Sequence, residues 1–409
     1  MPTHDTLRRA ALMRVETFDD VWIIGGRRSA FGRFGGALRE VTMLDLGRQV
    51  IDATVHATDW PVELLDELYV GTGMIEGGLM VPARQLAISA GLPETLPSLT
   101  VDRACCSGAT TVGLAARSIR SGSDSALCLG IETMSSTPRL IHGTRWGTRP
   151  GAVEVDDLLV LESPITGSPI AQYVGEVALE HGVSRRDQDI WALRSQNLYA
   201  DAVERGFFSD EIVSVETPNG PFLVDEHPRP DTTLEALAAL PTVRSSPTIT
   251  AGNAPGLNDG AAALILASQS AARQVGTDPA VRVAAYLQTA GSPTSSAYLP
   301  GLAVAALLDH LGMEPTDLDV IEINEAFAAT PLVSLRRLAG DPDLEAVLSD
   351  RTNMNGGAVA LGHPIGASGA RLTITAARQL VDTGGRWAAI AICGGFGQTD
   401  ALLLENVNG

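Results

Sequence analysis

The sequence predicts an α/β protein built from two halves that share one plan, with an insertion in the first half. Three observations lead to this prediction. Apolar, strand-like runs alternate with helical patterns along most of the chain, residues 107–117 and 368–378 are alike, and the composition changes between about 134 and 248. A chain of 409 residues is also long enough for two or three domain-sized units.

Continuous apolar runs define the expected strands of both halves. Such runs indicate sheets that are covered on both faces. In the first half, we expect strands within residues 20–28, 67–73, 125–132 and 259–268. In the second half, we expect them within residues 281–291, 319–328 and 388–397.

The internal repeat predicts one buried helix in each half. Residues 107–117 read SGATTVGLAAR and residues 368–378 read SGARLTITAAR, with Ser-Gly-Ala and Ala-Ala-Arg at the same offset. The apolar residues between these matches recur at helical spacing. A turn of small residues and an apolar strand follow each copy. The two halves are therefore expected to contain the same helix–turn–strand unit.

The middle of the chain has a different composition from the two halves. Prolines, charges and loop signals increase there, and helical patterns remain near 170–206 and 233–240. The predicted domain organisation is an N-terminal half formed by 1–133 and 249–280, an inserted domain at 134–248, and a C-terminal half at 281–409. Insertions that lie over a site often bind ligand.

The charge of the chain excludes several function classes. The formal net charge is −19, and all 29 residues counted as lysine or arginine are arginines. An acidic chain without a basic run is not expected to bind nucleic acid. The absence of lysine excludes a pyridoxal Schiff base and a Walker-type phosphate loop. An anionic ligand would have to be held by arginine, backbone N–H groups or helix N-termini.

The termini and cysteines suggest where the protein works. No apolar run reaches the roughly 20 residues that a membrane-spanning helix needs, so we expect no membrane insertion. Residues 1–18 lack the apolar core of a secretory signal, and fit a solvated start or a weak transit-like segment. The four cysteines lack metal-site spacing, so we expect no metal and free thiols in a cytoplasmic protein.

Adjacent cysteines mark a candidate nucleophile. Cys105 and Cys106 lie where a predicted strand turns into a predicted helix, a geometry that exposes nucleophiles in other folds. The partial positive charge of a helix N-terminus predicts a thiol pKa below the usual value of about 8.5. The alternative is that both residues are small buried fillers.

Three residues of the second half are further candidates. His363 lies in NMNGGAVALGHPIGASG, where the glycines allow a close backbone approach to a ligand, although a histidine can occur in a loop by chance. Cys393 ends an apolar strand and precedes glycines whose N–H groups can stabilise an oxyanion. Asn324 follows a strand, where it can orient a water or a carbonyl, or cap the next helix.

Together these stretches resemble the thiolase family, the enzymes that make or cleave the C–C bond of 3-oxoacyl-CoA thioesters. The resemblance covers most of the chain and includes RACCSG, GNAPGLNDGAAA, NEAFA, NGGAVALGHPIGASG and CGGFG in the family's order and spacing. It implies the thiolase fold, in which two duplicated halves with mixed sheets form αβαβα layers, with an inserted loop domain that covers CoA.

The resemblance also implies the role of each catalytic candidate. Cys105 is the nucleophile that becomes acylated, Cys106 is a buried filler, and His363 takes the Cys105 proton. Cys393 moves protons in the carbon–carbon step. One oxyanion site would use His363 and a water held by Asn324, and the other the backbone N–H groups of Cys105 and Gly395. Cys128 is interpreted as structural.

The family pattern predicts substrate-binding residues with some departures. Arg229 matches an arginine near the adenine and phosphates of CoA. Pro255 replaces a serine that contacts CoA, and Ile170, after Pro169, replaces the methionine of a His-Met pair. Tyr173 replaces a small residue near the acyl end. These changes favour short or medium acyl chains.

Two rival functions remain. A β-ketoacyl synthase-like enzyme would use Cys-His-His and lack Cys393, and a non-catalytic CoA- or lipid-binding relative would have HDCF in place of NEAFA. The resemblance implies CoA as substrate or product with no permanently bound cofactor, a homodimer or homotetramer, and a place in fatty acid metabolism such as β-oxidation. A hydratase or dehydrogenase partner subunit is a further expectation, and the physiological direction stays open.

Overall fold

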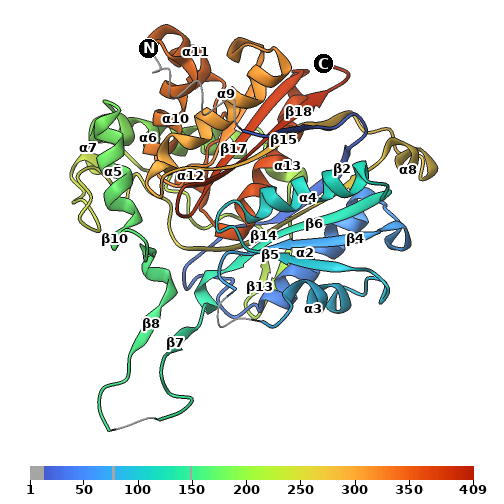
Figure 1. Ribbon diagram of the computed structural model, residues 1–409, viewed down its shortest axis with the longest axis horizontal. Helices are drawn as coiled ribbons and strands as arrows, with labels where there is room; N and C mark the ends of the chain where they lie inside the picture. Colours follow the sequence, from blue (N-terminus) through green and yellow to red (C-terminus); the bar gives the residue numbers. More distant parts are fainter. Residues whose placement is uncertain (1–12, 76–78, 148–149) are drawn as a thin grey trace.

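Two mixed sheets alternate with three layers of helices in the computed structural model, which describes residues 13–75, 79–147 and 150–409. Figure 1 shows the sheet of the first half, with β4, β5 and β6, below the sheet of the second half, with β15, β17 and β18. The expected solvated or transit-like start at residues 1–12 lies outside the described residues. The layers follow the αβαβα order that the sequence predicts.

The first sheet has the strand order β2-β14-β6-β4-β5, and the single antiparallel pair Trp22–Arg282 joins its strand β2 to β15 of the second sheet. β4 runs parallel to both β5 and β6, whereas β14 is antiparallel to β6 and to β2. The elements of this half are β2 (Trp22–Ser29), β3 (Gly32–Arg33), α2 (Met43–Thr58), β4 (Glu67–Gly71), α3 (Pro82–Ser89), β5 (Ser98–Val101), α4 (Ser107–Arg120), β6 (Ser125–Thr133), β14 (Asn258–Ala267) and α8 (Gln269–Gln274).

The second sheet repeats this order as β15-β18-β17-β16. β16 is parallel to β17, β18 is antiparallel to β17 and β15, and a bridge between Ile321 and Thr352 stands where the first half has its edge strand. The elements are β15 (Val281–Ala290), α9 (Leu299–Leu311), β16 (Val320–Ile323), α10 (Ala329–Ala339), α11 (Pro342–Asp350), α12 (Ala358–Leu361), α13 (Ile365–Thr383), β17 (Trp387–Gly394) and β18 (Gln398–Asn406). β1 (Val15–Thr17) adds to β15. The duplicated plan predicted from the repeat is confirmed.

The two repeat helices, α4 and α13, form the layer between the sheets. A Cβ on Gly108 would lie 2.6 Å from Gly366 O, and a Cβ on Gly369 would lie 2.3 Å from Ala109 N. These glycines belong to the two Ser-Gly-Ala copies, so the repeated motif is the place where the helix backbones meet. The inner faces of both sheets pack on this pair, for example through Leu264 and Ile390. The N-terminal ends of both helices, where the candidate catalytic residues lie, are thereby brought together.

Helices cover the outer faces of the two sheets. Leu46 and Val50 of α2 and Leu86 of α3 pack on the first sheet, and Val304 and Leu307 of α9 pack on the second. Both sheets are thus buried on both faces, as their continuous apolar strands predict. In the described residues, none of the helices has the length and apolar character required to cross a membrane.

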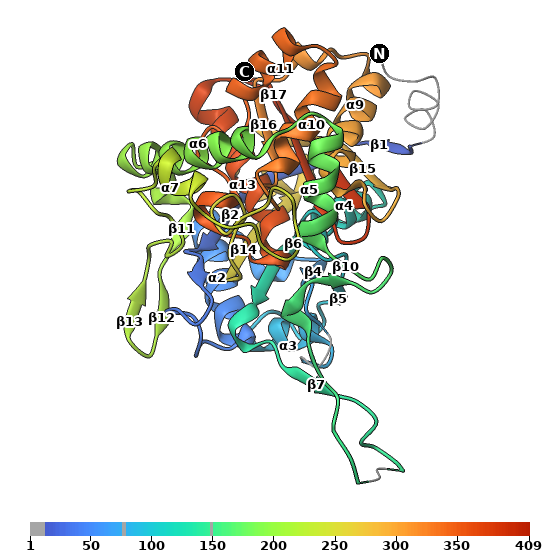
Figure 2. The ribbon, with the colours of Figure 1, turned by 90° about the vertical axis from the view of Figure 1, so that its left-hand side faces the viewer.

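The segment between β6 and β14 contains helices on one flank and a long hairpin. α5 (Ile170–Glu180), α6 (Arg185–Glu204) and α7 (Leu234–Ala238) lie together, in green, in Figure 1. β7 (Arg139–Ile141) and β8 (Val155–Asp157), both labelled in Figure 1, pair in an arm that Figure 2 shows extending away from the body. The short strands of this segment are β9 (Glu162–Ser163), β10 (Ser168–Pro169), β11 (Ile212–Val213), β12 (Val215–Thr217) and β13 (Gly220–Phe222).

Candidate active site

Cys105 lies on a strained turn between β5 and α4. Ala104 has a φ of 50°, a left-handed conformation that is unusual for a residue with a Cβ. Three hydrogen bonds hold the turn: Asp102 Oδ1 accepts from Ala104 N–H at 2.8 Å, and Ser107 Oγ accepts from Arg103 N–H at 2.9 Å and donates to Ala104 O at 2.7 Å. The turn leaves Cys105 partly exposed and buries Cys106.

The two adjacent thiols therefore point to different environments. Cys106 is fully buried, and its thiol donates to Ile392 O at 3.2 Å. Cys105 Sγ lies 3.1 Å from His363 Nε2. This geometry matches the filler role expected of Cys106 and the reactive role expected of Cys105.

His363 is held between α12 and α13 by its backbone and by its ring. Its N–H donates to Asn258 Oδ1 at 2.9 Å, and Nδ1 lies 2.6 Å from Ser368 Oγ. The Ser368 hydroxyl also donates to Pro364 O at 2.9 Å. Because the Ser368 hydroxyl proton is donated to Pro364 O, the Ser368 oxygen accepts the hydrogen bond from His363 Nδ1–H. This assignment leaves Nε2 unprotonated and facing the Cys105 thiol.

The cysteine–histidine pair is neutral at rest. Burial lowers the pKa of His363 to about 3, and Arg371 adds to the effect. Burial raises the pKa of Cys105 well above its ordinary value, and the neighbouring Cys393 and Glu132 raise it further. The prediction that the helix N-terminus lowers this thiol pKa is wrong, because desolvation of the thiolate outweighs the helix terminus. The Cys105 proton must move to His363 as the sulfur attacks.

Cys393 belongs to the second half of the chain, and the loop that follows it packs on the Cys105 turn. It lies near the end of β17 opposite Thr399, and a hairpin loop at 395–397 follows it. A Cβ on Gly394 would lie 2.7 Å from Arg103 O and 2.8 Å from Cys106 Sγ, so glycine is required for this loop to pack on the Cys105 turn. Burial raises the pKa of Cys393 to about 12. Cys393 is therefore a protonated thiol at rest whose thiolate is a strong base.

Asn324 is a buried polar residue next to the histidine. It directly follows β16, and its Nδ2 lies 3.4 Å from His363 Nε2. Its Oδ1 is buried and has no hydrogen-bond partner in the described part of the chain. The next helix, α10, has Ala328 as its N-cap, so the interpretation of Asn324 as a helix cap is wrong. The free oxygen fits the expected role of holding a water or a ligand atom.

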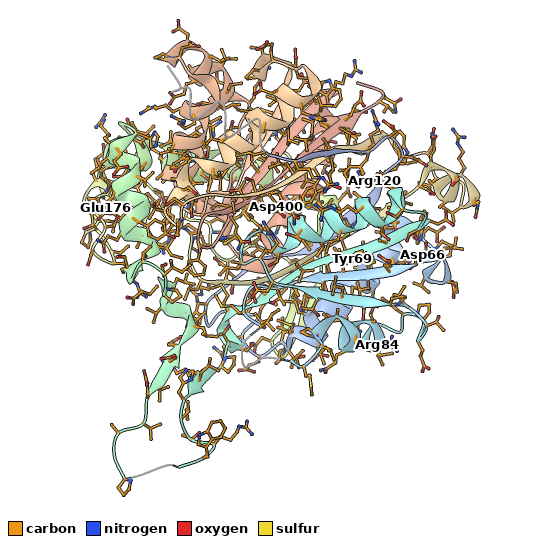
Figure 3. The ribbon with its side chains drawn as sticks, viewed as in Figure 1. Asp66, Tyr69, Arg84, Arg120, Glu176 and Asp400 are labelled. Atoms are coloured by element: carbon orange, nitrogen blue, oxygen red, sulfur yellow. The ribbon has the colours of Figure 1, made fainter. Side chains whose placement is uncertain are left out.

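An ion pair between the half-buried Arg103 and the buried Asp400 ties the Cys105 turn to the second half. Arg103 Nη2 lies 2.8 Å from Asp400 Oδ1, and Thr110 and Tyr286 donate to Asp400 Oδ2 at 2.5 and 2.6 Å. Figure 3 labels Asp400 near the centre of the molecule, where the halves meet. Breaking such a pair leaves an uncompensated buried charge, so it fixes the relative position of the two thiol-bearing loops.

Comparison with known proteins agrees with this constellation. The family models described as "Thiolase, N-terminal domain" and "Thiolase, C-terminal domain" match residues 21–270 and 277–406. The chain belongs to the thiolase family. The CoA-dependent thiolase activity, an acyltransferase reaction, that the sequence motifs predict is thereby confirmed.

Several thiolases are similar over nearly their whole length. The beta-ketoadipyl-CoA thiolase of Pseudomonas aeruginosa is 40% identical, with 95% of this chain and 99% of that protein covered. The mitochondrial 3-ketoacyl-CoA thiolase of Bos taurus is 35% identical, with 94% and 98% covered. The human mitochondrial 3-ketoacyl-CoA thiolase in complex with CoA has a TM-score of 0.89 at 34% identity, with 95% and 98% covered. The Bacillus anthracis acetyl-CoA acetyltransferase has a TM-score of 0.90 at 34% identity, with 95% and 99% covered.

The residues expected to contact CoA in this thiolase lie in the segment between β6 and β14. Arg229 is exposed, and its guanidinium has no carboxylate within 4 Å in the described residues. Pro255 is half-buried, and the following Gly256 N–H donates to His227 Nε2 at 3.3 Å, which brings the Arg229 and Pro255 loops together. Ile170 is half-buried at the start of α5. No hydrogen bond joins these residues to Cys105, His363 or Cys393 in the described chain.

Sequence reasoning missed the residues that position the catalytic groups. Ser368 was assigned only to a repeat helix, although it lies five positions after His363, close to one helical turn away. Glu132 lies one residue before the end of β6 and accepts from Thr72 Oγ1 at 2.9 Å, Gly73 N–H at 2.8 Å and Gly366 N–H at 3.0 Å. Burial raises the pKa of Glu132 to about 7. Its carboxyl group therefore joins two loops that flank Cys105.

Glu325 plays a similar part at the base of the histidine loop. It accepts from Trp191 Nε1 and Ser195 Oγ of α6, each at 2.8 Å, and from Val359 N–H of α12 at 2.9 Å. Sequence reasoning used Glu325 only to distinguish catalytic from non-catalytic relatives. The structure shows that it connects the inserted helices to the segment that leads to His363.

Proposed function

We propose that this thiolase cleaves 3-oxoacyl-CoA with CoA, or runs the reverse Claisen condensation of an acyl-CoA with acetyl-CoA, through an acyl-Cys105 intermediate. The observation that carries the proposal is the 3.1 Å contact between Cys105 Sγ and an unprotonated His363 Nε2 whose other nitrogen is fixed by Ser368. A neutral imidazole in this orientation can accept the thiol proton as the sulfur attacks a carbonyl carbon.

In the cleavage direction, Cys105 attacks the 3-oxo carbon and the bond between C2 and C3 breaks. The electron pair goes to C2 of the departing acetyl-CoA, and Cys393 supplies the proton. CoA then attacks the acyl group on Cys105, with its thiol deprotonated by Cys393, and releases the shortened acyl-CoA. In condensation, Cys393 gives its proton to the CoA that leaves as Cys105 is acylated; the resulting thiolate takes a proton from acetyl-CoA, and the carbanion attacks the acyl-enzyme. A thiol whose pKa is raised to about 12 suits both directions, because its thiolate is a strong base.

Two oxyanion sites support the proposed chemistry. The backbone N–H groups of Cys105 and Gly395 donate to no carbonyl or side-chain oxygen of the described residues, and their loops pack together. Unused donors of this kind are suited to a developing alkoxide. The second site would consist of the Nε2–H that His363 has once it holds the Cys105 proton, and a water held by the free Oδ1 of Asn324.

The segment at 134–248 would cover the CoA molecule between the N-terminal half, 1–133 and 249–280, and the C-terminal half, 281–409. Arg229 would pair with the phosphates or stack near the adenine, since it is exposed and has no carboxylate partner in the described chain. Ile170 and Pro255 would line the pantetheine and acyl end. We propose CoA as a substrate or product rather than a permanent cofactor.

The surface supports a homodimer or homotetramer. Strand β5 is the edge of the first sheet, and Leu99 on it and the nearby Met80 and Val81 are exposed. The arm formed by β7 and β8 also exposes Ile141 and Trp146. Exposed edges and apolar patches of this kind are usually covered by a partner. We propose a cytoplasmic enzyme of fatty acid metabolism, alone or with a hydratase or dehydrogenase subunit.

Separating the two half-reactions tests the proposal. Cys105→Ala should form no acetyl-enzyme from acetyl-CoA, whereas Cys393→Ala should still acquire one acetyl group, placed on Cys105 by mass spectrometry. Cys393→Ala should lose thiolysis of acetoacetyl-CoA by roughly 10²–10⁴-fold, the usual contribution of general acid–base catalysis.

Cys106→Ser is the matched control, because a serine hydroxyl can also donate to Ile392 O. This variant should keep both half-reactions. An acetyl group found on Cys106, or a Cys393→Ala variant that cannot be acetylated, would contradict the assigned roles.

A further inference from the structure

Tyr173 presents a buried hydroxyl without a hydrogen-bond partner. The residue lies in the first turn of α5, and 4% of its side chain is exposed. Its Oη is buried and has no hydrogen-bond partner within the described chain. An unsatisfied buried hydroxyl is unfavourable, so a native structure that keeps one needs an explanation such as a ligand.

Tyr173 belongs to a buried hydrophobic cluster. Val174, Ala297, Ala329 and Val333 belong to the same buried cluster, and Ile170 packs against it. Ile170 and Tyr173 are three residues apart on α5 and therefore share a helix face. A site that only had to bind an alkyl acyl chain would not need the Tyr173 hydroxyl in this cluster.

The helix that carries Tyr173 is separated from the strand that carries Cys393 by one short helix. α5 packs on the short helix Ser295–Ala297, which in turn contacts β17, the strand that carries Cys393. Burial is the main cause that raises the pKa of Tyr173 to about 12; the nearby Ser296 hydroxyl opposes the shift, and the thiols of Cys393 and Cys105 contribute in the same direction as burial. The phenol is thus a protonated donor within electrostatic reach of both sulfurs, although Ser296 and Tyr173 Oη do not reach hydrogen-bond geometry.

We propose that Tyr173 is a specificity-determining residue that donates a hydrogen bond to a neutral oxygen on the acyl chain carried by Cys105. This inference rests on the proposed function, because it needs the acyl-Cys105 intermediate. A neutral acceptor is favoured over a carboxylate because the groups that influence Tyr173 among the described residues are one hydroxyl and two thiols, with no arginine. The preferred acyl groups would carry a hydroxyl or carbonyl oxygen close to the thioester.

The enzyme should discriminate strongly between acyl chains with and without this oxygen, because a plain alkyl chain would leave the Tyr173 hydroxyl unpaired. A buried donor left without a partner corresponds to roughly a 5- to 150-fold preference for the oxygenated chain. Tyr173→Phe keeps the ring and removes the hydroxyl alone, so it should reduce this preference to near one. Tyr298→Phe is the matched control, since Tyr298 packs against the same cluster and its ring contacts His181 at 5.5 Å between centroids.

The test compares the rates at which three thioesters acylate Cys105: the two enantiomers of 3-hydroxybutyryl-CoA and 3-methylbutyryl-CoA. Each reaction is stopped by rapid quenching, and the acyl-enzyme is measured by mass spectrometry. The two acyl groups differ by a hydroxyl in place of a methyl. The wild type and Tyr298→Phe should prefer one hydroxyacyl enantiomer, and Tyr173→Phe should lose that preference. A wild type without a preference, or a Tyr173→Phe variant that keeps it, would overturn the inference. Wild-type enzyme that is not acetylated by acetyl-CoA would instead overturn the proposed function, and the inference with it.

Discussion

Replacing Ser368 by alanine removes the group that accepts the His363 Nδ1–H. The two atoms are 2.6 Å apart, and the side chains of His363 and Ser368 are 7% and 1% exposed, so water cannot readily take the place of the hydroxyl. The variant leaves a buried N–H unpaired and allows the proton to move to Nε2, where it would face the Cys105 thiol. His363 would then be unable to accept the Cys105 proton.

The expected loss follows from the energy of one unpaired buried donor. That energy is about 1–3 kcal/mol, which corresponds to roughly a 5- to 150-fold slower acylation of Cys105. Because Ser368 acts through His363 and not on the substrate, KM should change little while kcat falls. Rapid-quench mass spectrometry of acetyl-enzyme formation from acetyl-CoA measures this rate directly.

Thr373→Val is the matched control on the same helix. Thr373 Oγ1 donates to Gly369 O at 3.0 Å, the same i to i−4 bond that Ser368 makes to Pro364, but it has no contact with His363. The control should acylate at the wild-type rate. If Ser368→Ala also does so while His363→Ala does not, the assigned tautomer is wrong.

Two other predictions concern pH and chain length. The pKa of Glu132 is raised to about 7 in the folded state from an ordinary value of 4.5, so its protonation stabilises the fold below pH 4.5, and this contribution is lost as the pH rises through about 7. Glu132→Gln should therefore show a smaller decrease in the free energy of unfolding between pH 5 and 7.5, measured by denaturant titration; an unchanged pH dependence would show that Glu132 does not titrate there. The Tyr173 ring beside Ile170 should restrict the acyl pocket, so thiolysis across a series of 3-oxoacyl-CoA substrates should be fastest for short or medium chains, and a maximum at long chains would contradict this.

Local patterns in the sequence were sufficient for the fold class and the catalytic candidates. Continuous apolar runs and the Ser-Gly-Ala repeat predicted two sheets of the same plan. Both features depend only on residues that are close together in the sequence: an unbroken apolar run indicates a strand buried on both faces, and apolar residues at helical spacing indicate a helix. The motifs around Cys105, Asn324, His363 and Cys393 likewise lie in short stretches. The family itself followed from the order and spacing of these motifs.

The tertiary structure decided how those residues are held and charged. Ser368, Glu132 and Asp400 act on the site through partners that lie far away in sequence or on another turn of a helix, so no local pattern reveals them. The sign of the Cys105 pKa shift also needed the structure: the helix N-terminus is visible in the sequence, but the burial that outweighs it comes from packing the two halves together. The same packing buries the Tyr173 hydroxyl without a partner among the described residues, whereas the sequence showed only that a bulky residue stands in place of a small one.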